Sequence, residues 1–124
     1  MINHVSIAVR DIAKTKRFYD AALRPLGYTC LSESEGSLGY GRDAVVLWIS
    51  AAGKQDLPRT MPGLHFCFDA PTRDSVKAFH AAALKAGGRD NGKPGLRPDY
   101  SDAYYAGFVV DPDGYRLEAY CGAE

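Results

Sequence analysis

The feature that most constrains this fold is an internal repeat of about sixty residues. His4 and His65 each open a strand-like segment, so the two segments are offset by 61 residues (65 − 4). The strand-to-helix junctions at Arg10-Asp11 and Pro71-Thr72 share this offset. Two short β-α units can resemble each other by coincidence, but here the match continues into the later strands. The repeat therefore predicts two copies of one folding module.

The first half of the chain reads as one helix among four strands. Apolar and polar residues alternate over residues 2–9, which is typical of a strand. Asp11 is a good N-cap for the helix that follows, which we expect to end near residue 24. Three further strands are predicted, at residues 28–34, 37–42 and 44–51. The predicted order is β-α-β-β-β.

The second half repeats this order after a polar connector at residues 52–62. Thr72 is the predicted N-cap of its helix, which Gly87 and Gly88 close. Strands are predicted at residues 64–69, 88–92, 103–110 and 115–121, with a Gly/Pro-rich loop at residues 92–102. We therefore predict an α+β fold with two βαβββ modules in a single domain, residues 1–124. Module one spans residues 1–52 and module two spans residues 63–124.

The composition of the chain argues against several classes of function. Fifteen Lys and Arg balance fifteen Asp and Glu, which leaves no basic field for nucleic acid or an anionic membrane. No apolar run approaches the roughly 18–20 residues that span a bilayer, and the first residues do not resemble a secretory signal. Cys30, Cys67 and Cys121 are widely spaced and odd in number, which indicates reduced thiols. We expect a cytoplasmic protein whose partner is a small molecule.

Strand alternation selects three candidate metal ligands. His4 and His65 open the first strand of each module, and Glu118 lies on one face of the last strand with Arg116 and Tyr120. If the two modules curl into one cup, His4, His65 and Glu118 can converge inside it. Two imidazoles and a carboxylate hold a divalent metal and leave positions open for substrate.

Simpler interpretations of these three residues exist. Each histidine, taken singly, fits an exposed or hydrogen-bonded residue as well as a ligand. Glu118 can face solvent on an edge strand or pair with Arg116. A carboxylate buried among apolar neighbours, however, needs a partner.

The chain resembles the vicinal oxygen chelate superfamily, which includes glyoxalase I, bleomycin-resistance and fosfomycin-resistance proteins and extradiol dioxygenases. The motifs that carry the resemblance are distributed over nearly the whole chain. They are Ile2-Asn3-His4-Val5-Ser6-Ile7-Ala8-Val9-Arg10-Asp11, Phe18-Tyr19, Leu64-His65-Phe66-Cys67-Phe68 and Phe108-Val109-Val110-Asp111-Pro112-Asp113-Gly114-Tyr115-Arg116-Leu117-Glu118. None of these motifs is specific for one reaction.

The resemblance implies a cupped, mostly antiparallel sheet around a divalent metal. The superfamily's ligand positions correspond here to His4, His65 and Glu118. Zn, Ni, Mn and Fe all suit this set. The resemblance also implies a homodimer, and the sequence does not decide whether the site lies within one chain or across two.

Different members of the superfamily imply different activities. Glyoxalase I uses a fourth, carboxylate ligand in the last strand of module one, and matching the two modules by sequence places Leu47 there. Ala106-Gly107-Phe108-Val109 replaces the Ser-x-Tyr-Phe stretch of the fosfomycin enzymes. Bleomycin-resistance proteins lack the ligands that this chain keeps. For an extradiol dioxygenase the catalytic histidine is missing, since His80 reads as a structural residue of the second helix.

Further candidates lie in and after the Gly/Pro-rich loop. Arg97 can hold a carboxylate or phosphate, and Tyr100 and Tyr104 can line the substrate pocket. Tyr105 is the candidate acid/base residue. Cys67 shares a strand face with His65 and is a candidate contact to substrate, although it also reads as a small core residue. Trp48 is expected in the core or in a dimer interface.

These observations predict a lyase-, isomerase- or dioxygenase-like metalloenzyme that binds two oxygens of a small substrate to its metal, and not a true glyoxalase I. Two alternatives stay open. One is a metal-free protein that binds a small ligand such as an antibiotic, and the other is an extradiol-type dioxygenase.

Overall fold

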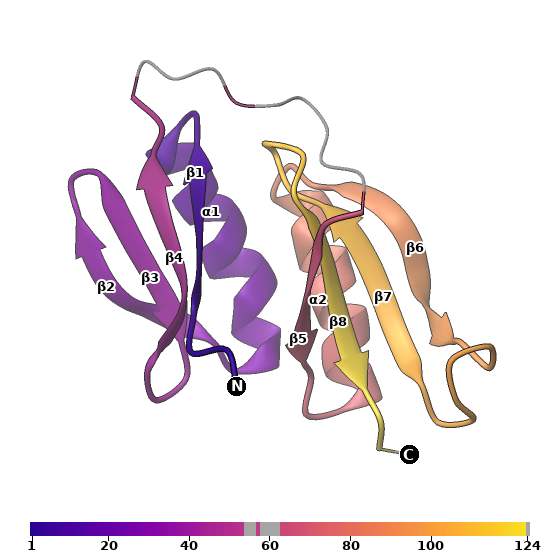
Figure 1. Ribbon diagram of the computed structural model, residues 1–124. Helices are drawn as coiled ribbons and strands as arrows, with labels where there is room; N and C mark the ends of the chain where they lie inside the picture. The colour runs from indigo at the N-terminus through magenta and orange to yellow at the C-terminus, as the bar shows by residue number, and fades with distance from the viewer. Residues whose placement is uncertain (54–56, 58–62, 124) are drawn as a thin grey trace.

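A computed structural model describes residues 1–53, 57 and 63–123. Most of the predicted connector, residues 52–62, lies outside the described residues. The predicted repeat is confirmed, because each half of the chain forms one four-stranded sheet and one long helix (Figure 1). Among the described residues, no helix is long and apolar enough to cross a membrane.

Module one contains β1, α1, a short 3-10 helix η1, β2, β3 and β4. Their bounds are β1 (Val5–Val9), α1 (Ile12–Leu23), η1 (Arg24–Leu26), β2 (Thr29–Ser34), β3 (Ser37–Gly41) and β4 (Val45–Ala51). The strand order in the sheet is β1-β4-β3-β2. Strand β1 is parallel to β4, and the other neighbours are antiparallel.

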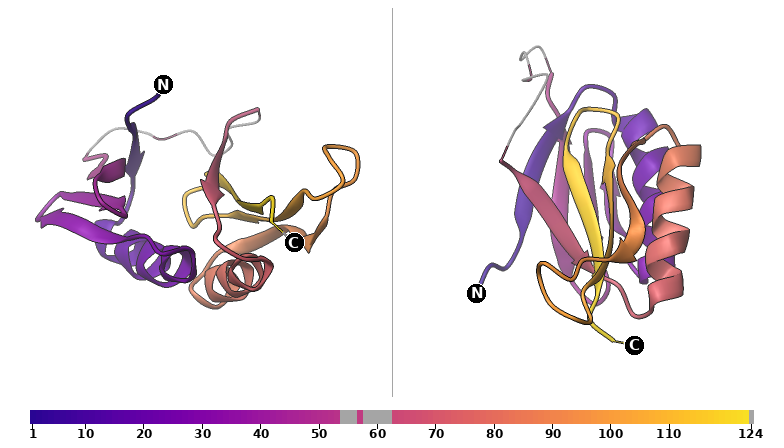
Figure 2. Two further views of the ribbon diagram at one scale, coloured as in Figure 1. Left: turned by 90° about the horizontal axis from the view of Figure 1, so that it is seen from below. Right: turned by 90° about the vertical axis from the view of Figure 1, so that its right-hand side faces the viewer.

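Module two repeats this arrangement with β5, α2, β6, β7 and β8. Their bounds are β5 (His65–Asp69), α2 (Arg73–Lys85), β6 (Arg89–Leu96), β7 (Tyr105–Val110) and β8 (Arg116–Cys121). The strand order is β5-β8-β7-β6, and β5 is parallel to β8. The two sheets are separate, each with its own edges, as the view from below shows (Figure 2).

The predicted helix starts are confirmed. The Asp11 side chain accepts a hydrogen bond from the backbone N–H of Lys14 at 3.0 Å. Thr72 and Ser75 form a reciprocal capping box at the start of α2. Both caps satisfy backbone donors that the first helical turn leaves without partners.

The prediction for β6 was wrong. A short strand at residues 88–92 and a loop at residues 92–102 were expected, but β6 continues to Leu96. Gly92, Pro94 and Gly95 are tolerated because β6 is an edge strand and its register with β7 shifts twice, at Asp90/Gly92 and at Gly92/Gly95. The loop therefore begins only after Leu96.

The two helices lie side by side and cover one face of each sheet (Figure 2). One continuous hydrophobic core joins both modules beneath them. Its largest fully buried side chains are Tyr19, Tyr40, Phe18, Phe79, Leu23, Leu26, Leu38, Leu47, Ile49 and Leu117. The face of each sheet that points away from the helices is left for function.

The turn between β7 and β8 fixes module two to module one. Buried Asp111 accepts the O–H of Tyr19, in α1, at 2.5 Å and the backbone N–H groups of Asp113 and Tyr115. Asp113 accepts the backbone N–H of Arg10 at 3.1 Å and its guanidinium at 3.0 Å. Because buried carboxylates need such partners, the turn has one favourable position on module one.

We expect Tyr19→Phe to lower the free energy of unfolding by about 1–3 kcal/mol, because buried Asp111 loses a donor. Burial raises the pKa of Asp111, whereas the Tyr19 hydrogen bond lowers it. The decrease in the free energy of unfolding should therefore be largest near pH 7, where Asp111 is ionised. It should be smaller at about pH 4, where protonation removes the charge that Tyr19 stabilises. Urea denaturation at both pH values measures this.

Tyr40→Phe is the matched control. The Tyr40 hydroxyl donates to Asp20 at 2.8 Å, but Asp20 is exposed, so water can replace the phenol. A loss in Tyr40→Phe as large as that in Tyr19→Phe would contradict the role given to Asp111.

Candidate metal centre

His65 and Glu118 meet on the open face of the second sheet. Cys67 of β5 is paired with Glu118 of β8, and His65 lies two residues earlier on the same face of β5. The His65 Nε2 is 3.0 Å from the Glu118 Oε1. Glu118 is only 3% exposed, although Leu117 and Ala119, its neighbours, take the core side of the strand. The predicted pair of ligands is thus brought together, with a buried carboxylate at its centre.

Tyr104 contacts the other oxygen of the same carboxylate. Its hydroxyl donates to Glu118 Oε2 at 2.5 Å, a distance typical of a hydrogen bond to a charged acceptor. Burial and the neighbouring Glu118 raise the pKa of Tyr104, so the phenol keeps its proton at neutral pH. The ring packs on Tyr120, with 4.2 Å between centroids. The sequence placed Tyr104 in the pocket but gave no sign of this contact.

His4 does not join the pair within one chain. It is exposed, and its Nδ1 is 2.7 Å from Oδ1 of neighbouring Asn3. Strands β1 and β5 run in opposite directions, so the start of β1, which His4 precedes, and the start of β5, which His65 forms, are at opposite ends of the two sheets (Figure 1). Among the described residues, no three His, Cys, Asp or Glu side chains gather as a metal site requires.

Two of the loop candidates lie near the pair. The Arg97 guanidinium is 5.4 Å from the ring centroid of Phe108, and Phe108 is the cross-strand partner of Glu118. Arg97 is held by the Lys93 carbonyl at 2.6 Å and has no ion-pair partner within the part of the chain described. Tyr100 is exposed and contacts Tyr104 edge-on, with 5.0 Å between centroids.

The remaining candidates lie elsewhere. Tyr105 alternates with Tyr104 and so takes the helix side of β7, where its ring centroid is 5.3 Å from the guanidinium of Arg73 in α2. His80 is buried on α2, and its Nε2 is 2.9 Å from Asp90 Oδ1, which fits the structural role predicted for it. Neither residue contacts the His65–Glu118 pair.

The sequence of the chain also matches a known protein family. The sequence model of the Glyoxalase/Bleomycin resistance protein/Dioxygenase superfamily matches residues 1–119. The chain belongs to this superfamily. Members of the superfamily often use divalent metals. No curated protein matches the chain.

Solved structures agree with the family. A glyoxalase/bleomycin resistance protein from Albidiferax ferrireducens T118 is 28% identical, with a TM-score of 0.85, and the match covers 95% of this chain and 96% of that one. A glyoxalase-related enzyme from Fulvimarina pelagi is 17% identical, with a TM-score of 0.75 over 97% and 86% of the two chains. A mutant of glyoxalase I from Zea mays is 20% identical, with a TM-score of 0.76 over 96% of this chain and 45% of the maize chain. The last two likenesses concern the fold alone.

The structure corrects the equivalence between the two modules. Leu47 was matched to Glu118, but Ser6 pairs with Trp48 as Cys67 pairs with Glu118, at the same offset of 61 residues (67 − 6). Trp48 is therefore the counterpart of Glu118, and Leu47 is a core residue. A shift of one residue moves a side chain to the other face of a strand. Tryptophan, like leucine, supplies no carboxylate for the fourth ligand that the superfamily's glyoxalase I enzymes use.

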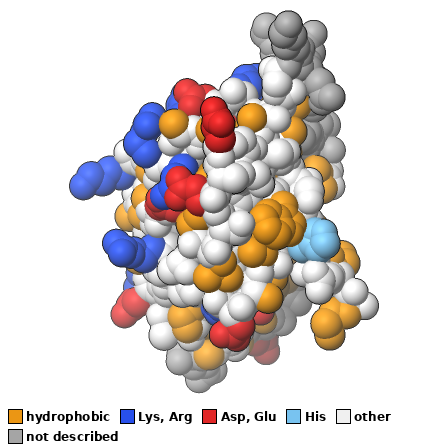
Figure 3. All heavy atoms as spheres, turned by 90° about the vertical axis from the view of Figure 1, so that its left-hand side faces the viewer, with side chains coloured by type: hydrophobic (Ala, Val, Ile, Leu, Met, Phe, Trp, Pro, Cys, Tyr) orange, Lys and Arg blue, Asp and Glu red, His pale blue; other side chains and the backbone are white. Residues whose placement is uncertain are grey.

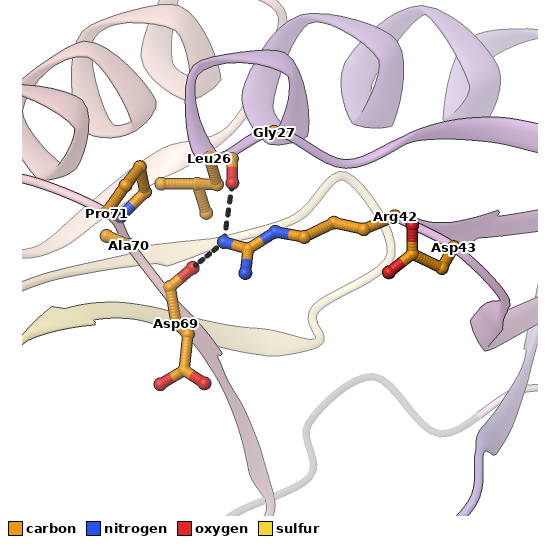
Figure 4. Close-up of a pocket in the computed structure, with 7 residues that line it drawn as sticks. All are labelled: Leu26, Gly27, Arg42, Asp43, Asp69, Ala70 and Pro71. Atoms are coloured by element: carbon orange, nitrogen blue, oxygen red, sulfur yellow. Dashed lines mark hydrogen bonds between the residues drawn. The ribbon is translucent and has the colours of Figure 1, made fainter.

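A pocket between the modules lies apart from the pair. Its volume is about 490 Å³, and its lining is Leu26, Gly27, Arg42, Asp43, Asp69, Ala70 and Pro71 (Figure 4). One nitrogen of Arg42 donates to the Leu26 carbonyl at 2.8 Å and to the Asp69 carbonyl at 3.1 Å. The guanidinium also stacks on Tyr28, 4.6 Å from the ring centroid. Arg42 thus links the two modules, a role that its place at the end of the predicted strand 37–42 did not reveal.

Cys67 is exposed and not a core residue, the alternative that its sequence context also suggested. It should nevertheless alkylate slowly, because desolvation of its thiol and the neighbouring Glu118 raise its pKa to about 12. At pH 8 only about 1 in 10⁴ such thiols is ionised, against roughly a quarter of ordinary cysteines. Glu118→Gln should speed the reaction of Cys67 with iodoacetamide by about tenfold or more, because each unit of pKa changes the thiolate fraction tenfold. Peptide mass spectrometry separates Cys67 from Cys30 and Cys121.

Asp69→Asn provides the control for this prediction. Asp69 is also acidic and lies two residues after Cys67, but it raises the pKa of that thiol less than Glu118 does. Equal acceleration by the two substitutions would show that Glu118 has no special contact with Cys67.

Proposed function

We propose that this chain is a metal-dependent enzyme that acts on a small substrate, with His65 and Glu118 as two of its metal ligands. The observation that carries the proposal is the 3.0 Å approach of His65 Nε2 to a carboxylate that is almost fully buried on the open face of its sheet. A buried carboxylate on that face is costly unless a cation or hydrogen bonds compensate it. A role in metal binding explains why the chain keeps it there.

The donor atoms fit a divalent metal. Imidazole nitrogen and carboxylate oxygen suit Zn, Ni, Mn and Fe alike. Two ligand atoms about 2.1 Å from one ion, in tetrahedral or octahedral geometry, are about 3.0–3.4 Å apart, so the observed pair needs little rearrangement. When bound, the metal supplies a Lewis acid that polarises substrate oxygens.

The third ligand in this proposal is His4 of a second copy of the chain. His4 is exposed, and β1 and β5 begin at opposite ends of the two sheets within one chain. Exposed apolar side chains, Met1 and Ile2 before it and Val46 beside it on β4, make this end of β1 suited to a contact with another protein surface. Figure 3, which faces the module-one side of the molecule, shows hydrophobic side chains gathered beside a histidine. We therefore propose a homodimer whose two sites each combine both copies.

The chain's own side chains suit a small anionic substrate. Arg97 can pair with a carboxylate or phosphate of the substrate, because it is fixed over Phe108 and has no acidic partner among the described residues. Tyr100, exposed at the rim, can cover an apolar part. Cys67 lines the same face. We propose a reaction other than that of glyoxalase I, because Trp48 stands where a fourth ligand would be needed.

Metal content tests the ligand pair. Purified wild-type protein should hold about one divalent metal per chain, measured by elemental analysis, and His65→Ala and Glu118→Ala should each lose most of it. His80→Asn is the control, since His80 pairs with Asp90 away from the site. The metal found then selects the assay: oxygen uptake for iron, and isomerase or thiol-transfer screens for zinc, nickel or manganese.

Mixing two inactive variants tests the shared site. His4→Ala and His65→Ala should each lose most of the metal when prepared alone. When they are unfolded together and refolded, mixed dimers should recover one intact site, made of His4 from one chain and His65 with Glu118 from the other. If each site lay within one chain, the mixed dimers would bind no more metal than the separate variants. Elemental analysis after gel filtration distinguishes the two results.

A metal-free ligand-binding protein is the second candidate. It is favoured by the lack of any third ligand near His65 and Glu118 within the described part of one chain. Wild-type protein that takes up no metal after reconstitution, while both variants stay folded, would establish this alternative in place of the enzyme.

A further inference from the structure

The Glu118 carboxylate has a separate partner for each of its two oxygens. Oε1 lies 3.0 Å from His65 Nε2, and Oε2 accepts the Tyr104 O–H at 2.5 Å. A glutamate carboxylate that is hydrogen-bonded through both oxygens cannot rotate freely about its Cγ–Cδ bond. The orientation of Glu118 is therefore set by two residues that approach it from different elements, β5 and the segment before β7.

Tyr104 is itself held in place. Its backbone N–H donates to the Ser101 carbonyl at 3.2 Å, and its own carbonyl accepts the Arg97 N–H at 2.7 Å. Its ring lies between Tyr120, at 4.2 Å, and Tyr100, at 5.0 Å between centroids. The hydroxyl is thus aimed at Glu118 by a fixed loop and by aromatic packing, not by a free side chain.

We infer that Tyr104 is a positioning residue that makes Glu118 a one-oxygen metal ligand. Its O–H engages Oε2, so that Oε1, on the His65 side, would be the oxygen presented to an ion. This inference rests on the proposed metal site. Glu118 would then take one coordination position instead of two, which would leave an additional position for a substrate oxygen.

The phenol suits this role better than that of a ligand or a proton carrier. The Tyr104 O–H is already engaged as a hydrogen-bond donor to Oε2 of Glu118, so it acts on the carboxylate and not directly on the metal. Tyr105, the neighbour that sequence reasoning favoured for acid/base chemistry, packs on Arg73 at the other face of the sheet. Removal of an outer hydrogen-bond partner of a metal ligand typically costs about 10–100-fold in affinity.

The test compares Tyr104→Phe with Tyr40→Phe. Each substitution removes one phenolic hydroxyl, but the Tyr40 hydroxyl donates to exposed Asp20 in module one and not to a site residue. In cobalt-loaded protein, Tyr104→Phe should weaken Co(II) binding by about tenfold or more. It should also lower the intensity of the visible absorption bands, as expected when Glu118 binds through both oxygens and the coordination number rises. Tyr40→Phe should match the wild type in both measurements.

A second measurement uses metal-free protein. In Tyr104→Phe the freed carboxylate should turn, so the ¹⁵N signals of the His65 ring should shift relative to the wild type, while Tyr40→Phe leaves them in place. Unchanged His65 signals would overturn the positioning role whether or not a metal binds.

The two proposals fail in different ways. Wild-type protein that binds no cobalt contradicts the proposed function, and the His65 signals then decide the role of Tyr104 alone. Wild-type protein that binds cobalt, with unchanged affinity and spectrum in Tyr104→Phe, refutes the inference and leaves the metal site standing. Thermal unfolding confirms that each variant is folded before either measurement is made.

Discussion

The arrangement of the two modules depends on buried carboxylates at the β7–β8 turn. Asp111 accepts hydrogen bonds from Tyr19 of module one and from the backbone of the turn itself, and Asp113 accepts hydrogen bonds from Arg10 of module one. An ionised group in a protein interior is stable only when its partners are in place, so the turn cannot slide along module one without losing them. Strand β8 begins two residues after this turn. The position of Glu118 along the sheet therefore depends on the contact between this turn and module one.

Because side chains alternate along a strand, one face of the second sheet packs in the core and the other face carries the site residues. Leu117, Ala119 and Cys121 face the helices and belong to the core. Glu118 and Tyr120, between them, lie with His65 and Tyr104 on the opposite face. The same strand thus supplies core contacts and site residues, and a change of register would exchange the two sets.

Much of this fold could be predicted from sequence, because local signals and tertiary structure agree. Alternation, the caps at Asp11 and Thr72, and the repeat identified the modules and placed His65 and Glu118 on one face. Strand β6 was predicted too short because glycine and proline usually mark loops, whereas an edge strand with register shifts accepts them.

The site was harder to predict than the fold, because its contacts depend on register and on loop geometry. Leu47 and Trp48 differ by one residue, and only strand pairing shows which of them is the counterpart of Glu118. Tyr104 and Tyr105 are adjacent and chemically identical, yet the start of β7 sends them to opposite faces. The separation of His4 from His65 follows from the opposite directions of β1 and β5, and nothing within either strand encodes it.

Arg42 adds a contact between the modules that is chemically unlike the turn. Its guanidinium binds the main-chain carbonyls of Leu26 and Asp69 (Figure 4). Carbonyl oxygens do not titrate in the physiological range, and every amino acid has one. This junction is therefore indifferent to pH and to the identity of the side chains at positions 26 and 69. Evolution is free to change those side chains, and with them the lining of the adjacent pocket, while the two modules stay joined.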